Sequence, residues 1–585
     1  MNVAPTGRNV ADAENSGIVP LILGITGHRN PSTAHLDQLS GELARIFTEL
    51  RQRFPHTPLK LISPLAEGAD RIVAKLAVEN GVGLIVPLAW PADICQEQLH
   101  RSGNRGEFDH LVKAAEQVIE LPLAEGITQQ SLAAEEDARN RQYQQVGAYV
   151  ARHSQILIAL WDGVVKRDGG TSRVITWQQQ GALAPYAANL GWLDKVENGP
   201  VFHVHTPREG ETDQQAAVTM EVRYPTEYTD MPQAEHDFSR LWGCIEEFNA
   251  DVLSDDRAYQ QQVAPRKDWC IPEDKCPELA QPLSMLLEAF ARADAAAIRF
   301  QKKTNFTLKA LFLMVVVGVG CFEFYAHLFV DSPLLLVGYI ALLFGSICWY
   351  WFAVRRDYQR KYLDYRGLAE ALRVQLYWRI AGLTDSVADH YLRNLRSELD
   401  WIRQALRACH LVSGGHQRPT SVSEDKSAGI ALAKVFWIDD QFKYFSDSAP
   451  KNERIHKQCT LLSFGAFWSS IALACILLWV HIYTDHLHHA LVVAVFVWAT
   501  AAALQQEYAE KQACSIQAKR YDWMRWLFHT AQQETEGLLK TGNNEDAQSL
   551  ILELGKEALA ENAEWVLQRR ERPIMPPHTY APREH

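Results

Sequence analysis

Two patterns of hydrophobic and polar positions divide the chain. Over residues 19–208, short apolar runs alternate with stretches whose apolar positions recur at the spacing of an amphipathic helix. The runs predict strands at Val19–Gly27, Leu59–Leu65, Val82–Leu88, Gln117–Leu123, Gln155–Gly163 and Pro200–Arg208. The stretches between them predict helices at His35–Phe54, Ala69–Asn80, Phe108–Ala115, Gln142–Ser154 and after Thr171. Strands alternating with helices predict an α/β fold with a doubly wound, mostly parallel, Rossmann-like sheet.

Four long apolar blocks follow in the rest of the chain, at Ala310–Phe329, Pro333–Val354, Cys459–Tyr483 and Ala490–Leu504. A helix needs about 20 apolar residues to cross about 30 Å of hydrocarbon, so the first three blocks suffice and the fourth needs its flanking residues. Their lengths disfavour the alternative, core helices of a large soluble domain. We therefore predict an all-α part with four transmembrane helices and long cytoplasmic helices.

The orientation of these blocks follows from their charged flanks. Lysine and arginine residues flank both pairs of blocks on one side, whereas the short turn inside each pair has none. By the positive-inside rule, each pair is a hairpin that enters from the cytoplasm and returns. The opening residues are polar and lack the apolar core of a signal peptide. We expect a multi-pass protein of the inner (cytoplasmic) membrane with both termini in the cytoplasm.

The two hairpins share one plan, in which a helical lead-in, a hairpin and a helix rich in tyrosine and basic residues follow one another. Residue identity between them is weak, so this is an architectural repetition rather than a sequence repeat. The predicted division is a flexible N-terminus (1–18), a sheet domain (19–208), a helical connector (209–305), a first hairpin with cytoplasmic helices (306–412), a flexible loop (413–428), a second hairpin with cytoplasmic helices (429–540) and a C-terminal amphipathic helix and tail (541–585).

Composition narrows the possible partners. The chain of 585 residues carries 58 Lys and Arg against 70 Asp and Glu, a formal charge of −12, which disfavours a nucleic-acid partner. A hydrophobic content of 47% excludes wholesale disorder. The ten cysteines form no CxxC pair and no metal-ligand spacing, so neither a metal site nor a disulfide scaffold is expected.

Glycine and polar residues gather where three predicted strands end. In a doubly wound sheet, ligands bind beyond the carboxyl ends of the strands, and a Gly-rich turn before a helix lets backbone N–H groups approach a phosphate. The candidate ligand-binding residues are Gly27, His28, Arg29, Ser63, Glu67, Gly68, Asp70, Asp162, Gly169, Gly170 and Thr171. Alternatively, each glycine makes a tight turn and Asp70 caps a helix; three such motifs at strand ends favour a nucleotide-like ligand.

At these residues the chain resembles the SLOG superfamily, a Rossmann-like group that includes DNA-processing proteins and the Lonely Guy phosphoribohydrolases. The motifs GITGHRN, SPLAEGAD, IALWDG and GGT occur in order within residues 20–208. The resemblance implies a nucleotide or nucleotide-derived ligand at a Gly-rich site between strand ends. No further cofactor is implied.

One departure from the family bears on catalysis. The phosphoribohydrolase branch places carboxylates directly after its PGGxGT signature, and a carboxylate there serves N-glycosidic cleavage. Here Ser172 and Arg173 follow Thr171, so the acid is missing and a cation stands near its place. This favours binding over hydrolysis, while Glu67 and Asp70 are the catalytic candidates if the protein is an enzyme.

The hairpins resemble the SLATT class of two-span effector domains, mainly through their architecture and the helix YLDYRGLAEALR. Such domains accompany SLOG sensors in bacterial defence systems and are inferred to form oligomeric membrane pores. Two hairpins in one chain depart from the usual single hairpin and suggest a covalent pseudo-dimer. The resemblance implies a homo-oligomer embedded in the lipid bilayer. Melastatin-type cation channels also join a SLOG-like domain to membrane helices, an analogy only.

Ionisable side chains occur near the outer ends of the apolar blocks. Glu323 and His327, one helical turn apart, are candidates for pore lining, against the alternative that Glu323 lies at the interface and bonds a neighbour. A second group at the other outer turn fits a solvated turn better than a metal or pH-sensing site. Its members are His481, Asp485, His486, His488 and His489.

Beyond the last span, Gly555–Pro573 is an amphipathic helix that ends in three arginines, Arg569, Arg570 and Arg572. It could bind lipid headgroups. We expect it instead to dock on the N-terminal domain, because Trp565 and Leu567 need burial.

Two functional hypotheses follow. The first is a nucleotide sensor coupled to a membrane effector, a ligand-gated oligomeric pore or membrane-disrupting protein in bacterial signalling or anti-phage defence. The alternative is a membrane-anchored nucleotide-processing enzyme, a phosphoribohydrolase-like N-glycosidase. An enzyme is the less favoured of the two, and a scaffold with a vestigial pocket is a third reading.

Overall fold

The structure is a computed structural model of the chain. It describes residues 17–90, 105–165, 170–182, 186, 197–209, 218–254, 257–271, 283–391, 399–415, 426–483, 485–511 and 514–571. Residues 1–16 of the predicted flexible N-terminus, most of the predicted loop at 413–428, and Gly169 lie outside these residues.

The N-terminal domain is built on a seven-stranded sheet in the order β4-β3-β2-β1-β5-β6-β7. The strands are β1 (Leu21–Gly27), β2 (Leu59–Ile62), β3 (Gly83–Leu88), β4 (Gln117–Glu120), β5 (Ile156–Trp161), β6 (Val201–His205) and β7 (Met220–Arg223). The first six are parallel, and β7 runs antiparallel to β6. The predicted mostly parallel sheet is confirmed, but β7 lies in a segment predicted to be helical. Its four half-exposed residues are too short for a period-two pattern to be recognised.

Helices cover this sheet as an α/β fold requires. They are α2 (Leu36–Arg53), α3 (Ala69–Glu79), α5 (Arg105–Ala114), α6 (Gln129–Ala134), α7 (Glu136–His153) and α8 (Gly170–Gln180). The central strands β1 and β5 are buried along nearly their whole length, which explains their continuous apolar sequence. The strand order reverses between β1 and β5, and this is the point where doubly wound sheets bind ligands.

Two connector helices join this domain to the rest of the chain, α9 (Met231–Val252) and α10 (Arg257–Cys270). The Asn249 side chain on α9 accepts a hydrogen bond from the Val19 N–H (3.1 Å) and donates one to the Val19 carbonyl (2.8 Å). It therefore pairs with the backbone just before β1 as a neighbouring strand would. The amino end of the central strand is thereby tied to the connector.

The remainder is helical. Its main helices are α12 (Ser284–His327), α13 (Pro333–Arg355), α14 (Tyr358–Ile380), α15 (Asp400–Val412), α16 (Lys426–Ala433), α17 (Asp440–Tyr483), α18 (Asp485–Lys511), α19 (Cys514–Thr541) and α20 (Asn544–Arg570). A π-helical turn, Lys434–Asp439, joins α16 to α17. Among the described residues, four helical segments are long and apolar enough to cross a membrane, in agreement with the prediction.

Burial separates the two ends of this helical part. At one end Trp378, Trp401 and Trp437 are almost fully buried in a shared core. In the apolar hairpins α13 has no buried residue, and Leu334 and Phe344 are 77% and 64% exposed. Apolar side chains exposed on this scale are stable in lipid rather than in water. The hairpins are therefore the membrane part.

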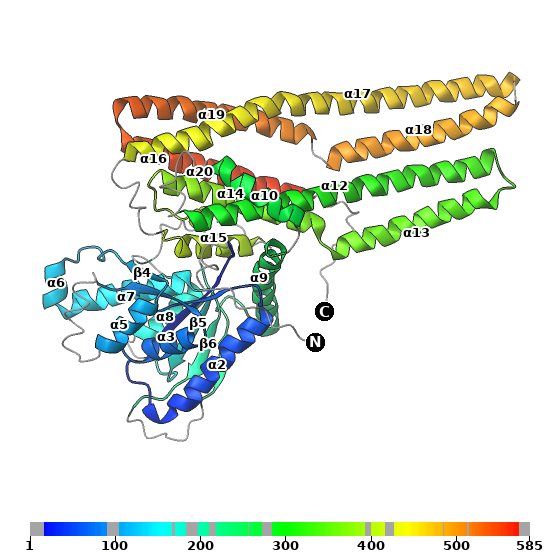
Figure 1. The fold of residues 1–585 in the computed structure, drawn as a ribbon. Helices are drawn as coiled ribbons and strands as arrows, with labels where there is room; N and C mark the ends of the chain where they lie inside the picture. Colours follow the sequence, from blue (N-terminus) through cyan, green and yellow to red (C-terminus); the bar gives the residue numbers. More distant parts are fainter. Residues whose placement is uncertain are drawn as a thin grey trace.

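The architectural repetition is visible in the packing. In each repeat the lead-in helix continues into the first span, and the helix after the hairpin packs back along it: α14 along α12, and α19 along α17. The hairpins also contact each other, α18 along α12, so the four spanning helices lie side by side in the order α17, α18, α12, α13 (Figure 1).

The C-terminal helix does not dock where the sequence suggested. Helix α20 packs between α14 and α19 in the helical part, not on the N-terminal domain. Trp565 packs edge-on against Tyr362 of α14, with ring centroids 5.9 Å apart, and Arg570 pairs with Asp364. Trp565 and Leu567 are half-buried, so the predicted burial is met in part. The predicted surface was wrong, because an amphipathic pattern does not identify its partner.

Candidate functional site

The carboxyl ends of β1, β5 and β6 bring three ionisable residues together: His28, Asp162 and Arg208. The Asp162 carboxylate, just after β5, lies 3.2 Å (Oδ1) from His28 Nε2, just after β1. Its other oxygen accepts a hydrogen bond from Arg208 Nε at 2.6 Å. Arg208 follows β6 and pairs with Pro31 in an isolated bridge, so three strand ends converge on one carboxylate. Arg208 is a site residue that the sequence analysis missed, although its place after a strand was a usable signal.

Asp162 is held ionised by these contacts. Burial alone would raise the pKa of its carboxyl group, but the Val164 N–H, which donates to Oδ1 at 3.0 Å, and the Arg208 guanidinium outweigh burial. The pKa of Asp162 therefore lies below its ordinary value. The Asp162 N–H donates to His28 Nε2 at 2.9 Å, so in the neutral imidazole the proton is on Nδ1. The Asp162 carboxylate and its partners therefore connect the loops that follow β1, β5 and β6.

Two helices begin beside the end of β1. Helix α8 starts at Gly170, and the Thr171 hydroxyl donates to the Gly27 carbonyl at 2.9 Å. Helix α3 starts at Ala69, whose N–H donates to the His28 carbonyl at 3.0 Å. The first turns of α3 and α8 thus flank one strand end, and a helix N-terminus favours anions through its free N–H groups and its dipole.

Three glycines near the carboxyl ends of the strands differ in what surrounds the position of a Cβ atom. A Cβ on Gly27 would lie 2.4 Å from the Ala69 Cβ, so the close packing of β1 on α3 explains this residue. Gly68 has a φ of +89°, and a Cβ there would lie 2.0 Å from the Arg29 carbonyl oxygen. No heavy atom of the described residues lies within 4 Å of the Cβ position of Gly170, which is exposed. Among the described residues, Gly170 is therefore the one of these three glycines whose surroundings leave room for a ligand.

Ser63, in the loop that precedes α3, and Asp70, in the first turn of α3, are both buried. The Ser63 hydroxyl donates to the Asp70 carbonyl and accepts from the Leu65 N–H, both at 3.2 Å. Burial raises the pKa of the Asp70 carboxyl to about 7, although the Ala66 N–H and two arginines oppose the shift. Both side chains therefore shape the loop from inside. Glu67 is exposed, so of the two catalytic candidates it is the one that solvent reaches.

A cation and two aromatic rings lie next to this loop. The Arg29 guanidinium lies over the Tyr143 ring, 5.5 Å from its centroid, and Tyr143 packs edge-on against Trp90 at 5.2 Å. Tyr143 is 38% exposed. Arginine and exposed aromatic rings are groups that contact phosphates and bases of nucleotides. Neither ring was predicted as a site residue, because the sequences of α7 and of the segment after β3 carry no motif.

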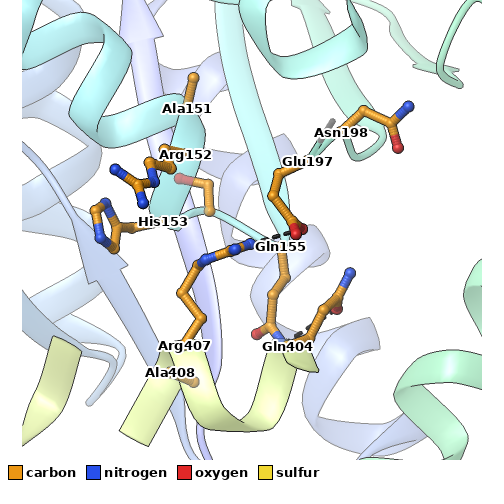
Figure 2. A pocket seen from close by; sticks show the side chains of 10 residues that line it. Ala151, Arg152, His153, Gln155, Glu197, Asn198, Gln404, Arg407 and Ala408 are labelled. Atoms are coloured by element: carbon orange, nitrogen blue, oxygen red, sulfur yellow. Dashed lines mark hydrogen bonds and ion pairs between the residues drawn. The ribbon is translucent and has the colours of Figure 1, made fainter. Parts of the chain in front are cut away.

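The junction with the helical part lies at the other end of the strands, beside the amino end of β5 (Figure 2). Arg407 on α15 pairs with Glu197 at 2.6 Å and with Asp389 at 3.4 Å, and Asp389 pairs with Arg152 at the end of α7 at 2.5 Å. Burial would raise the pKa of Asp389, but Arg152 and Arg407 hold it below its ordinary value. This alternating cluster spans both domains beside the amino end of β5.

A cavity of about 270 Å³ lies next to the junction, between α9 and α15. Acidic, aromatic and basic side chains line it, among them Asp237, Phe238, Arg240 and Trp401. Tyr228 donates to Asp237 at 3.4 Å across one side. This cavity lies at the contact between the domains, away from the carboxyl ends of the strands.

The two pore candidates lie on one side of α12. Glu323 is 9% exposed, and its carboxylate lies 3.5 Å from His327 Nε2. The His327 ring stacks on that of His489 of the other hairpin, with centroids 6.3 Å apart. Most side chains of the histidine-rich outer turn lie outside the described residues, namely those of His481, Asp485, His486 and His488. Glu323 therefore sits between helices near the contact of the hairpins.

Among the residues that the structure describes, no group of three or more His, Cys, Asp or Glu side chains is arranged to hold a metal ion. Comparisons of the chain with models of protein families, with curated proteins and with solved structures give no match.

Proposed function

We propose that the protein is a sensor of a nucleotide-derived ligand that controls an oligomeric membrane effector, a pore or membrane-disrupting assembly in bacterial signalling or anti-phage defence. One observation carries the proposal. The groups that favour an anion lie at the carboxyl ends of the strands, and the domain junction lies at the amino ends of the same sheet. A ligand at one edge is thus held apart from the helices while remaining joined to them by a rigid layer.

The ligand class follows from the groups at the strand ends. Two helix N-termini, the space beside the Gly170 Cβ position that the described residues leave open, and the guanidinium groups of Arg29 and Arg208 suit a phosphate. The exposed ring of Tyr143 suits a base. These features support a nucleotide, and the buried position of Asp70 supports binding over hydrolysis.

A continuous set of contacts supports coupling to the membrane. Asn249 ties α9 to the amino end of β1. Two acidic residues of the same helix, Glu247 and Asp251, pair with Arg360 (2.5 Å) and Lys361 (2.7 Å) of α14. Helix α14 begins three residues after the end of the span α13. A shift of α9 on ligand binding would therefore act on the end of a spanning helix.

The membrane placement belongs to the same proposal. The basic flanks support both termini and the sheet domain on the cytoplasmic side of an inner membrane. A single chain supplies four spans, and a pore of useful width needs several chains, so we include homo-oligomerisation.

The test uses the full chain in lipid nanodiscs with inorganic phosphate, a panel of mono-, di- and cyclic nucleotides, and a cell nucleotide extract. Thermal shift reports binding and mass spectrometry reports products. We expect a ligand that raises the melting temperature and is recovered unchanged. Gly170→Leu fills the open space and should weaken binding at least tenfold. Gly41→Leu, at an exposed helical glycine with equally open surroundings on α2, is the control and should bind normally.

Two outcomes would overturn the proposal. Equal binding by the Gly170→Leu and Gly41→Leu variants would place the ligand elsewhere. Conversion of the ligand to base and sugar phosphate, abolished by Glu67→Gln, would instead identify the alternative, a membrane-anchored nucleotide-processing enzyme.

A further inference from the structure

The cavity between α9 and α15 plays no part in the proposed nucleotide site. It measures about 270 Å³ and lies at the contact between the domains, where small-molecule sites commonly occur. Well-packed protein interiors leave few voids larger than a water molecule. Three side chains that line this cavity are almost inaccessible, since Phe238, Trp401 and Arg403 are 5%, 1% and 3% exposed. The floor of the cavity is therefore deep inside the contact between the domains.

The charged side chains that line the cavity favour a cation. They comprise four carboxylates and two guanidinium groups. One of the guanidinium groups, that of Arg403, already pairs with Glu197 at 3.1 Å, and Glu197 pairs in addition with Arg407 at 2.6 Å. The remaining charges are three carboxylates and one guanidinium, those of Glu227, Asp237, Asp400 and Arg240. A neutral or anionic occupant would leave this excess of negative charge in a space with little water.

Two of these carboxylates act on one phenol and come from different helices. The Tyr228 hydroxyl, in the segment after β7, donates to Asp237 Oδ2 on α9 at 3.4 Å. Burial raises the pKa of Tyr228 to about 12, and Asp237 and Asp400 of α15 add to the rise. Among the described residues, the ion-pair partner of Asp237 is His236 at 3.5 Å, an exposed side chain that is charged only when protonated. Asp237 therefore has no permanently charged cationic partner among these residues.

The walls of the cavity distinguish an organic cation from a metal ion. In the part of the chain that the structure describes, no group of three or more acidic, histidine or cysteine side chains is arranged to hold a metal ion. The apolar side chains of Phe238, Leu241 and Trp401 lie among the charged ones. Ammonium and guanidinium groups bind carboxylates and the faces of aromatic rings, and an alkyl chain between two such groups suits apolar walls.

Two lining residues also contact the ion pairs that hold α14. The Cys244 sulfur, on α9, lies 3.9 Å from Arg360 Nη1 of α14. The Trp401 indole N–H, on α15, donates to Asp364 of α14 at 3.3 Å. Helix α14 begins three residues after the span α13 ends. An occupant of the cavity would therefore lie against the two helices that connect the sheet domain to the end of a span.

We propose that this cavity is a regulatory site for a small organic cation with two ammonium or guanidinium groups, which bind the carboxylates of Asp237 and Asp400. The cation bridges α9, which is tied to the sheet, and α15 of the helical part, and so stabilises the contact between the domains. This inference goes beyond the proposed function, because it concerns a second site and a ligand of opposite charge. A cation that favours one arrangement of the junction also changes the affinity for a ligand at the strand ends, and the reverse holds equally.

The test titrates putrescine and agmatine, two small dications, into the full chain in nanodiscs of zwitterionic lipid, whose surface does not attract amines. Isothermal calorimetry measures binding. We expect saturable binding that Asp237→Asn and Asp400→Asn each weaken about tenfold, the effect of losing one hydrogen bond between charged groups. Glu235→Gln removes an exposed carboxylate of α9 that does not line the cavity. It is the matched control and should bind normally.

A chemical readout locates the ligand without any substitution. Burial raises the pKa of the Cys244 thiol to about 11, so its alkylation by N-ethylmaleimide is slow and is measured at mildly alkaline pH. Bound agmatine should slow this alkylation further, because Cys244 lines the cavity. Mass spectrometry resolves the modified peptides. Cys348 on the span α13 is the internal control, and its alkylation should not change.

Four results would overturn the proposal. They are the absence of binding at millimolar amine, an equal loss of binding in Glu235→Gln and Asp237→Asn, unchanged alkylation of Cys244 in the presence of agmatine, and displacement of the amine by magnesium chloride at matched ionic strength. The last would identify a metal ion as the occupant.

The two proposals fail separately, because this test needs no nucleotide. Gly170→Leu should bind the amines as wild type does. Nucleotide binding without amine binding would refute the regulatory site alone, and amine binding without nucleotide binding would refute the sensor alone.

Discussion

At the scale of single residues, the pKa values of two carboxyl groups near the carboxyl ends of the strands are shifted in opposite directions. Asp162 receives an N–H and a guanidinium, so its pKa is lowered. Asp70 is enclosed by the loop before α3, so burial raises its pKa to about 7. The protonated Asp70 is favoured in the folded state, and it therefore makes stability depend on pH.

The sign of this dependence follows from linkage. The folded-state pKa of Asp70 exceeds its unfolded value, so its stabilising contribution is present below about pH 4 and is lost as the pH rises through about 7. Asp70→Asn cannot ionise and retains an oxygen for the Ala66 N–H. Against wild type, the variant should gain on the order of 3 kcal/mol between pH 5 and pH 8. Thermal unfolding of the full chain at pH 5 and pH 8 measures it, with exposed Asp137→Asn as the control. A difference from wild type that does not change with pH would contradict the assignment.

Residue types alone could not sort the candidate site. Gly27, Gly68 and Gly170 look alike in the sequence, and only the neighbours of each Cβ position separate packing from open space. Ser63 and Asp70 were correctly placed at a strand end, yet they point inward, which a motif does not encode. Arg208 was missed because no motif marks the end of β6, which also contributes to the candidate site.

At the scale of elements, a buried ion pair ties the end of α20 to α14. Asp364 on α14 is fully buried and contacts Arg570, the last residue of α20, Arg360 at 3.8 Å and the Trp401 indole N–H at 3.3 Å. Burial raises the pKa of Asp364 although both arginines lower it. Removing one partner of such a pair leaves a charge that is poorly compensated.

Arg570→Met should therefore destabilise the helical part by about 3 kcal/mol, at the low end for a broken buried pair because Arg360 remains. Asp364→Asn combined with Arg570→Met should recover part of that loss. Arg525→Met, which removes an exposed pair with Asp522, is the control and should change little. Thermal unfolding in detergent distinguishes them. Equal effects of Arg570→Met and Arg525→Met would show that the Asp364 pair does not hold α20.

The elements themselves were mostly predictable. Strands and spanning helices carry long apolar runs, and these runs depend only on burial in protein or lipid. The strand β7 and the docking surface of α20 were not predictable, since both depend on contacts with distant parts of the chain. A short edge strand has one neighbour to pair with, and an amphipathic face fits any apolar surface of similar shape.

At the scale of the molecule, the alternating cluster around Arg407 joins two domains. Arg152 and Glu197 belong to the sheet domain and its loops, whereas Asp389 and Arg407 belong to the helical part. Arg407→Met should leave Glu197 and Asp389 facing each other without their shared cation. We expect a single thermal transition in wild type to separate into two, as the domains unfold independently. Calorimetry of the full chain measures this, with exposed Arg141→Met on α7 as the control. A single transition that only shifts downward would argue that the junction does not depend on this cation.

The contact of α18 with α12 also bears on how much protein an assembly requires. Two hairpins on one chain meet at an effective concentration set by their connecting segment and independent of how much protein the cell makes. The hairpin contact within each chain would thus be complete before two chains meet. Expression level would then govern the remaining contacts alone, and a cell could keep the protein scarce while still allowing rapid assembly on demand.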